Sequence, residues 1–331
     1  MERVIGVDVG GTKTHVRIER GPDQLADYVI PTASWWAPGS PLELPDNASA
    51  LAHELGGPDG ASAVVVGAHG IDSVRVADAM AAELRRFFAG PVRVLNDAAL
   101  VGPAAGYPGA VVTVIAGTGS IVLATDAEGV EVRLGGHGYL LGDEGSAPAL
   151  VRDLARDVLR GVDRGVTDDI ALRHLLAAAG LPPSAEPEED LAAELHHRHS
   201  ITDWGQLAPA VFAAADAGSP LARAVVQRHA DELVELVELH LARGVVPEAV
   251  VLAGGVVTAQ PRLADAIRAG VHRVHPELPV VLLTRPPVEG AVVLARAELA
   301  RPHPASRSAH PATEPITSTA QVPAQPEGSR P

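Results

Sequence analysis

Short apolar runs separated by glycine-rich turns mark the first half of the chain. One run opens at Val4 and ends in two glycines, and a second β-type stretch follows at residues 15–18. Residues 26–30 continue the pattern, so the sequence predicts three antiparallel strands at the start of a first sheet. Further strands are predicted from apolar runs at 63–67, 91–95, 109–115, 121–124, 249–252 and 279–283.

Apolar residues at helical spacing predict helices between and after these strands. In residues 74–88, for example, Val76, Met80, Leu84 and Phe87 recur on one helix face. Other helices are predicted at 47–55, 98–105, 148–159, 204–217, 221–243, 261–271 and 290–299. Strands that alternate with helices indicate an α/β protein. From residue 302 to 331 the chain is rich in Pro, Ala, Ser, Thr and Gln without periodicity, which predicts a disordered tail.

The first turn has the composition of an anion-binding turn. Gly10 and Gly11 let the backbone approach a ligand and point N–H groups at it. Asp8, near the end of the preceding strand, can hold a metal ion through water. The remaining polar groups of the turn are two hydroxyls and one charge: Thr12, Lys13 and Thr14. Because the turn leads into a strand, it is neither a Walker loop nor a dinucleotide loop; an ordinary Gly-Gly hairpin turn is the alternative.

A second turn of the same design lies at residues 116–120. The strand before it ends in Ala-Gly-Thr-Gly-Ser, which includes Thr118 and Gly119, and the chain resumes as a strand at residue 121. Two copies of strand, glycine turn and strand predict duplicated domains that face one nucleotide. We expect these domains at 1–106 and 107–287, with a helix at about 288–300 packing back on the first.

Three other segments are candidates for ligand contact. Asn96-Asp97 stands between a strand and a small-residue helix, which suits a catalytic carboxylate, a helix cap, or both. Residues 135–146 hold five glycines and an Asp-Glu pair, so this loop can approach a ligand closely. Gly254-Gly255 would let an adenine and ribose lie against bare backbone, and a helix–sheet packing contact is the alternative.

The tryptophan pair and His69 each have two possible roles. Trp35 and Trp36 lie in a proline-rich loop, where their indole faces could stack on a sugar, or one buried ring could anchor the loop. His69, after the strand at 63–67, could contact substrate or serve a structural role.

Composition excludes several classes of protein. A chain of 331 residues can form two domains with separate cores. Its 26 basic against 41 acidic residues disfavour nucleic acid and anionic membranes as partners. No apolar run is long enough to span a membrane, and the strand at the N-terminus leaves no room for a signal peptide, so we expect a cytoplasmic protein. The absence of cysteine excludes disulfides and cysteine-ligated metal clusters.

In this order, the motifs resemble those of the sugar kinase and actin superfamily, and within it the N-acetylglucosamine kinase or BadF/BadG/BcrA/BcrD ATPase family. The match covers about residues 3–300. The resemblance implies an α/β fold of two ribonuclease-H-like (actin-like ATPase) domains around a central cleft, with ATP on one wall and the sugar at the base. Family ATPases that hold an iron–sulfur cluster do so with cysteines, which this chain lacks.

The resemblance also implies a role for each matching residue. Asp97 would be the general base that takes the proton from the attacking hydroxyl. Contacts to ATP and Mg²⁺ would come from Asp8, Gly10, Gly11, Thr12, Lys13, Thr118, Gly119, Gly254 and Gly255. Contacts to the sugar would come from Ser34, Asn96, Ser120, Gly136, His137, Gly138 and Asp143. His137 and Ser34 stand where family members carry Trp and Asn, so the phosphate end matches the family better than the sugar end.

The implied activity is transfer of the γ-phosphoryl group of Mg-ATP to a hydroxyl of an amino sugar. N-acetylglucosamine, giving the 6-phosphate, is the first expectation, and glucosamine or another hexose is the second. A protein that senses sugar and ATP without turnover is the alternative from another class. The resemblance also suggests a homodimer.

Overall fold

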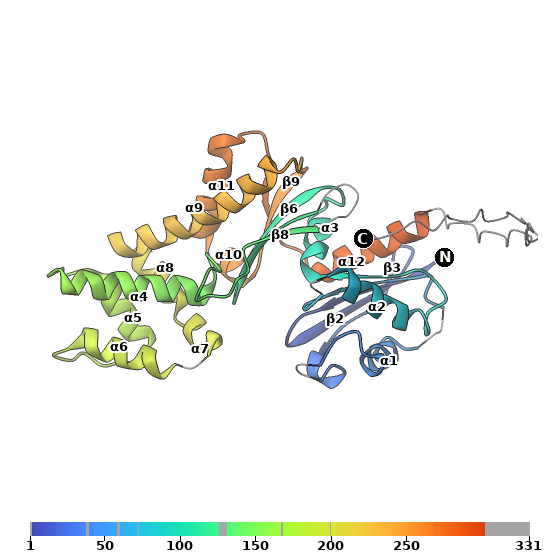
Figure 1. Cartoon of the computed structure of the whole chain (residues 1–331), viewed down its shortest axis with the longest axis horizontal. Helices are drawn as coiled ribbons and strands as arrows, with labels where there is room; N and C mark the ends of the chain where they lie inside the picture. Colours follow the sequence, from blue (N-terminus) through green and yellow to red (C-terminus); the bar gives the residue numbers. More distant parts are fainter. Residues whose placement is uncertain are drawn as a thin grey trace, which may run out of the picture. The chain divides into compact units, whose positions relative to one another are not determined.

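The computed structural model describes residues 2–37, 40–57, 60–71, 73–125, 131–166, 168–198 and 200–301. Residues 2–300 contain two five-stranded sheets with helices against them (Figure 1). The predicted tail at 302–331 lies outside the described residues. Residues 1–300 form one compact unit, so the predicted domain boundary after residue 106 stays a prediction.

The first sheet begins with the three antiparallel strands that the sequence predicts. They are β1 (Arg3–Val9), β2 (Lys13–Arg20) and β3 (Asp23–Pro31). Two parallel strands, β4 (Ala63–Ala68) and β5 (Val92–Asn96), follow on the other side of β1. The strand order is β3-β2-β1-β4-β5, which places three parallel strands side by side with their carboxyl ends at one edge.

The second sheet repeats this topology. Its strands are β6 (Val111–Ala116), β7 (Ser120–Thr125), β8 (Glu131–Leu134), β9 (Ala249–Ala253) and β10 (Val280–Leu282). The order is β8-β7-β6-β9-β10, again with an antiparallel meander followed by two parallel strands. The two glycine turns therefore occupy equivalent positions, and the duplication predicted from them is confirmed at the level of topology. The sequence pattern did not predict β8.

Helices pack on both sheets. In chain order they are η1 (Thr32–Ser34), α1 (Pro45–Glu54), α2 (Val74–Leu84), η2 (Asp97–Leu100), α3 (Val101–Ala104), α4 (Ala147–Asp163), α5 (Ile170–Ala178), α6 (Pro187–His197), α7 (Ile201–Gly205), α8 (Ala208–Asp216), α9 (Pro220–Ala242), α10 (Gly255–Ala259), α11 (Pro261–Val274) and α12 (Pro287–Ala300). The predicted helix at 204–217 is two helices, because a capping box starts α7 at Ser200 and a proline in its first turn starts α8. The short helix α10 was not predicted.

The last helix, α12, packs on the first sheet. Val292 and Ala295 of α12 are buried with Val4 and Val65 of that sheet. Glycine permits the close approach at Gly290, where an added Cβ would lie 2.0 Å from the Leu100 carbonyl oxygen. The chain thus returns to its first sheet after building the second.

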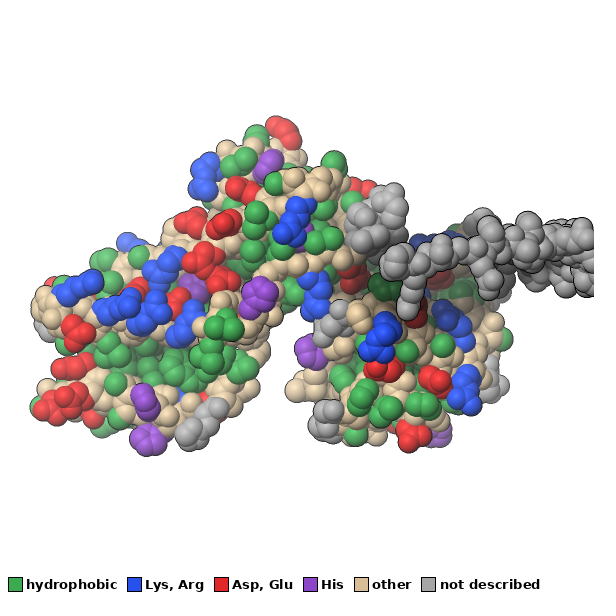
Figure 2. Space-filling view, in the orientation of Figure 1, with side chains coloured by type: hydrophobic (Ala, Val, Ile, Leu, Met, Phe, Trp, Pro, Cys, Tyr) green, Lys and Arg blue, Asp and Glu red, His purple; other side chains and the backbone are tan. Residues whose placement is uncertain are grey.

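Separate apolar cores support the two sheets. Val7, Val66 and Leu51 belong to the first core, and Val114, Leu154 and Leu252 belong to the second. Basic and acidic side chains lie side by side over α4 and α9 on the face drawn in Figure 2. One of their ion pairs joins Arg228 and Asp157 at 3.0 Å. Among the described residues, no helix is both long and apolar enough to cross a membrane.

Candidate active site

Three ionisable groups lie at the carboxyl edge of the first sheet. Asp8 is near the end of β1, His69 follows β4, and Asp97 follows β5; these three strands are neighbours in the sheet. Burial, together with the charge of Asp97, raises the pKa of Asp8 to about 6. The two carboxylates are therefore close enough to interact, although β4 lies between the strands that carry them.

Asp97 is a fixed and partly desolvated carboxylate. Its Oδ1 accepts a hydrogen bond from the Ala98 N–H at 3.0 Å. Burial raises its pKa, and the positive charges that His69 and Arg133 can carry oppose that rise. Arg133 belongs to β8, so a side chain from the second sheet contributes to the environment of an acid on the first.

The amide of Asn96 is engaged within the chain. Its Nδ2 donates to the Ile71 carbonyl at 3.0 Å, and its Oδ1 accepts from the Ala98 N–H at 3.0 Å. Asn96 is 5% exposed and caps η2. The capping interpretation is thus correct for Asn96, and a contact with sugar stays a prediction.

The first glycine turn presents Gly11, Thr12 and Lys13 to solvent. Its base is closed by a hydrogen bond from the Gly10 N–H to the Lys13 carbonyl at 2.9 Å. The exposed groups of these three residues, on a tight turn, can form a cradle for phosphate oxygens.

Thr14 is not part of that cradle, which corrects the expectation that its hydroxyl faces a ligand. It is fully buried, and its Oγ1 accepts from Trp35 Nε1 at 3.0 Å and lies 3.0 Å from Thr32 Oγ1. Thr32 in turn donates to the Gly10 carbonyl at 2.8 Å. An indole N–H only donates and a carbonyl only accepts, so the chain of bonds has one direction: Trp35 to Thr14 to Thr32 to Gly10.

This chain of bonds anchors the tryptophan loop to the turn. Trp35 is 5% exposed within the first core, which confirms the alternative of one buried anchoring ring. Trp36 stacks beside it with ring centroids 6.1 Å apart and lies 3.5 Å from an added Cβ at Gly70. Ser34, in the same loop, is exposed and donates to the Pro31 carbonyl at 2.7 Å.

On the second sheet, the turn after β6 touches the turn after β9. Gly254 has a φ of 101°, and a Cβ there would lie 2.4 Å from the Ala116 carbonyl oxygen, so only glycine fits. A Cβ at Gly117 would lie 3.5 Å from the Gly255 nitrogen. Thr118, Gly119 and Gly255 are exposed, whereas Ser120 is buried.

The glycine-rich loop at 135–146 joins the same cluster. Asp143 has a φ of 58°, the only positive φ of a non-glycine residue within the described ranges. Its Oδ1 accepts from the Gly138 N–H at 2.9 Å, and its Oδ2 would lie 3.2 Å from a Cβ at Gly119. Gly136 and His137 are exposed. The structure therefore brings the predicted sugar loop against the second glycine turn.

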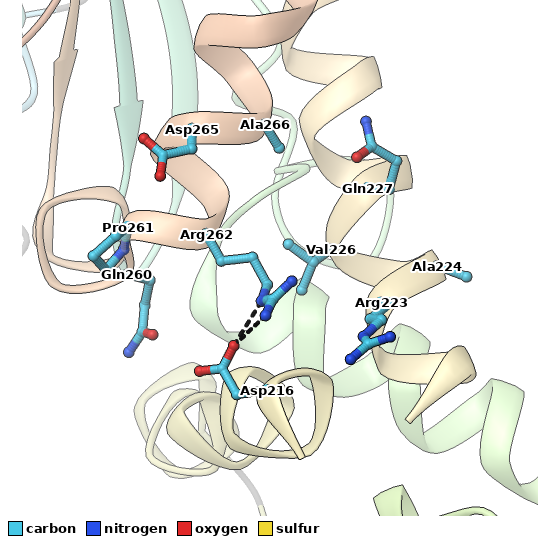
Figure 3. A pocket seen from close by; sticks show the side chains of 10 residues that line it. All are labelled: Asp216, Arg223, Ala224, Val226, Gln227, Gln260, Pro261, Arg262, Asp265 and Ala266. Carbon is cyan, nitrogen blue, oxygen red and sulfur yellow. Dashed lines mark hydrogen bonds and ion pairs between the residues drawn. The ribbon is translucent and has the colours of Figure 1, made fainter. Parts of the chain in front are cut away.

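A hollow of about 820 Å³ lies beside the junction of α10 and α11 (Figure 3). Residues from α8, α9 and α11 line it, and an ion pair from Arg262 to Asp216 crosses one side. Gln260, on its wall, is separated from Gly255 by the length of α10, about 7 Å at 1.5 Å per residue. A smaller hollow of about 480 Å³ lies next to Asn96, with Arg93 and Arg133 on its walls.

The donor set at Asp8 fits a magnesium ion. Mg²⁺ in phosphoryl-transfer sites takes one or two carboxylates, waters and substrate phosphates rather than a complete protein cage. Asp8 is a partly buried carboxylate next to a second carboxylate, so a divalent cation there would offset their repulsion. In the described part of the chain, no cluster of three His, Asp or Glu residues offers an alternative metal site.

Sequence reasoning missed two parts of this site. It left the role of His69 open and did not consider Arg133, although both influence Asp97. The position of His69 directly after a central strand was a usable signal. Arg133 gave no such signal in the sequence, because its proximity to Asp97 depends on the pairing of β8 within another sheet.

Two sheets of repeated topology, each carrying a glycine turn after its first strand, define the actin-like ATPase class of fold. The chain belongs to the BadF/BadG/BcrA/BcrD ATPase family, whose model matches residues 5–295. An N-acetylmuramic acid/N-acetylglucosamine kinase from Clostridium acetobutylicum is 27% identical over 90% of this chain and 99% of that protein.

Further relatives agree with this assignment. An N-acetyl-D-glucosamine kinase from Dictyostelium discoideum is 26% identical over 89% of this chain and 98% of that protein. A solved structure from Chromobacterium violaceum, provisionally named an N-acetylglucosamine kinase, aligns with a TM-score of 0.63 at 23% identity. It covers 89% of this chain and 99% of its own, and at that identity it supports the fold alone.

Proposed function

We propose that the chain is an ATP-dependent kinase that phosphorylates an amino sugar, with N-acetylglucosamine as the preferred acceptor. The observation that carries the proposal is Asp97. It is a partly buried carboxylate held by a backbone N–H, next to Asp8 and at the same sheet edge as the first glycine turn. Two relatives over nearly the full chain are named as kinases of N-acetylglucosamine.

Asp97 acts as the general base. The acceptor hydroxyl of the sugar donates its proton to the Asp97 carboxylate as its oxygen attacks the γ-phosphorus. The bond from that phosphorus to the oxygen it shares with the β-phosphate breaks, and ADP leaves. A positioned base of this kind contributes on the order of 10²–10⁴ in rate. The hydrogen bond from Ala98 fixes one oxygen of the carboxylate, so the other is left to face the hydroxyl.

The two glycine turns neutralise and orient the phosphates. Phosphoryl transfer depends mainly on positioning and charge stabilisation. Thr12 and Lys13 on the first turn, and Thr118 on the second, are exposed groups that can bind phosphate oxygens. Asp8 would hold Mg²⁺ through water, and the ion would supply positive charge that offsets the charge of the phosphates.

The nucleoside lies along Gly254-Gly255 toward the hollow at the α10–α11 junction. Bare backbone at these glycines allows flat groups to approach, and Thr118 is only one residue from the Gly117 that contacts Gly255. Gln260 and Asp216 offer hydrogen-bonding groups on the walls of the hollow (Figure 3). The second sheet thereby contacts both the phosphates, through Thr118, and the nucleoside, through Gly254-Gly255.

The sugar lies between Asp97 and the loop at 135–146. Asp143, His137 and the exposed backbone at Gly136 and Gly138 supply polar groups for its hydroxyls, and Ser34 and Ser120 complete the set. His137 and Ser34 determine how well the N-acetyl group is accepted. Glucosamine is the acceptor expected if they favour a free amine.

A coupled ADP-release assay tests the proposal. The panel contains N-acetylglucosamine, N-acetylmuramic acid, glucosamine, N-acetylmannosamine and glucose, each with Mg-ATP. Wild-type protein should turn over N-acetylglucosamine, and Asp97→Asn should lower kcat by about 10²–10⁴ while calorimetry still detects ATP binding. Near-normal turnover by Asp97→Asn would refute the role of Asp97. Binding of ATP and sugar with no ADP released from any acceptor would instead favour a sensor.

A further inference from the structure

His229 is a buried polar residue beneath the glycine-rich loop, and the proposed mechanism does not use it. It lies on α9 and is 1% exposed. The Gly145 N–H donates to its Nδ1 at 2.7 Å. On the other side of the ring, Nε2 lies 3.1 Å from Asp153 Oδ2 on α4.

These contacts define the protonation of the ring. A backbone N–H can only donate, so Nδ1 accepts and carries no proton. The proton of the neutral ring is then on Nε2, which faces the Asp153 carboxylate. Arg152 Nε donates to the other Asp153 oxygen at 2.8 Å. These neighbours lower the pKa of Asp153 below its ordinary value, so the carboxylate stays charged beside Nε2.

The backbone at Gly145 lies directly on α9. Its φ is 80°, and an added Cβ would lie 2.6 Å from Leu233 Cδ1, one helical turn after His229. The loop therefore meets α9 at one point by close packing and by a single hydrogen bond. A buried acceptor at this position is required because the Gly145 N–H would otherwise be unpaired.

Backbone hydrogen bonds next to Gly145 connect it to the proposed sugar-binding segment at Asp143 and to the proposed phosphate-binding turn at Gly117. The Ser146 N–H donates to the Asp143 carbonyl at 3.0 Å, which holds the backbone that carries the Asp143 side chain. The Ala147 N–H donates to the Gly117 carbonyl at 2.8 Å, which holds the second phosphate turn. One contact on α9 thus supports a sugar-binding segment and a phosphate-binding segment together.

We propose that His229 is a positioning residue, oriented by Asp153, that holds the 135–146 loop in its sugar-binding conformation through the Gly145 N–H. This rests on the proposed function, since it assigns the loop to the sugar. His229 touches neither substrate. Its effect is on the placement of Asp143 and, through Ala147, on the turn that carries Thr118.

Two substitutions of His229 test its contact with Gly145 and its contact with Asp153 separately. An Asn side chain can place its oxygen near the position of Nδ1, so His229→Asn keeps an acceptor for the Gly145 N–H. A Gln side chain reaches the position of Nε2, so His229→Gln keeps a group near Asp153 and loses that acceptor. Arg228→Gln is the matched control, because it changes the adjacent residue on α9, whose ion pair with Asp157 does not touch the loop.

Steady-state kinetics and amide exchange form the test, with each variant first compared to wild type by thermal unfolding. His229→Gln should raise the KM for the sugar about 10-fold or more, a loss of about 1.4 kcal/mol. Its KM for ATP should change less, while His229→Asn and Arg228→Gln stay within about 3-fold of wild type. Hydrogen–deuterium exchange of the peptide spanning Gly145 should accelerate in His229→Gln only.

The exchange measurement does not depend on catalysis, so it distinguishes this proposal from the proposed function. A wild-type protein without kinase activity would refute the function, and protection at Gly145 would still be measured in each variant. Unchanged sugar KM and unchanged exchange in His229→Gln would overturn the proposal. Equal kinetic losses in the Gln and Asn variants, in parallel with equal losses of thermal stability, would also overturn it by showing a purely structural role.

Discussion

Replacing Thr14 with Val tests the hydrogen-bond chain that joins the tryptophan loop to the first glycine turn. Val has nearly the same shape as Thr, so the change removes a hydroxyl without opening a cavity. The indole N–H of Trp35 loses its acceptor in a buried position, and the hydroxyl of Thr32 loses the bond it receives. Thr32 keeps its own bond to the Gly10 carbonyl.

The expected cost follows from these two losses. A buried donor left unpaired costs about 1–3 kcal/mol, and one lost neutral hydrogen bond costs about 0.5–1.5 kcal/mol. Together they lower the free energy of unfolding by about 1.5–4.5 kcal/mol, which is large against the total stability of an ordinary domain. Urea unfolding followed by circular dichroism and by tryptophan fluorescence measures it, because Trp35 reports directly on the affected loop.

Thr12→Val is the matched control. Thr12 is exposed on the same turn, so its substitution should change stability by no more than about 0.5 kcal/mol. It should instead raise the KM for ATP, because its hydroxyl is the one proposed to bind phosphate. If Thr14→Val unfolds at the wild-type urea concentration, or raises the KM for ATP while remaining stable, the buried hydrogen-bond chain is wrong.

Two further predictions concern the last helix and Asp8, the carboxylate proposed to hold Mg²⁺. Gly290→Ala should destabilise the protein by about 3 kcal/mol or more, because its new Cβ would lie 2.0 Å from the Leu100 carbonyl oxygen and the backbone must shift to relieve the clash. If the variant unfolds at the same temperature as the wild type, that close contact is contradicted. Because the pKa of Asp8 is raised to about 6, its carboxylate is protonated at a higher pH than usual, so kcat/KM should fall as the pH drops through about 6. Excess Mg²⁺ should move this fall in kcat/KM to lower pH, because the ion favours the ionised form of Asp8. A fall centred near pH 4 that does not change with Mg²⁺ concentration would contradict the assignment.

Local patterns were sufficient for the sheets and their turns. Alternating apolar runs around Gly10 and Gly117 predicted both hairpins, since a glycine turn between two β-type stretches leaves few other local structures. The α/β class followed from strands that alternate with helices, and the actin-like fold followed from the resemblance of the motifs to a known superfamily. The strand β8 was missed because it lies at a sheet edge and has no buried residue: Val132 and Arg133 are exposed, and Glu131 and Leu134 are only partly buried.

Other features depend on contacts between distant residues. Thr14 carries a hydroxyl that could bind phosphate, and only its hydrogen-bond partners Thr32 and Trp35 show that this hydroxyl is structural. His229 lies within a regular helical pattern, and its contact with Gly145 joins residues 84 positions apart. No spacing rule connects such pairs, because the packing of the helices and strands between them decides where they meet.

Observation of the phosphorylated sugar tests the assignment of this chain as a kinase most directly. Phosphorus NMR of the protein with Mg-ATP and N-acetylglucosamine should show a sugar 6-phosphate resonance that grows as the γ-phosphate resonance declines. Asp97→Asn, under the same conditions, should leave both nearly unchanged. Inorganic phosphate as the only product, formed at the same rate with and without sugar, would contradict phosphoryl transfer to a sugar.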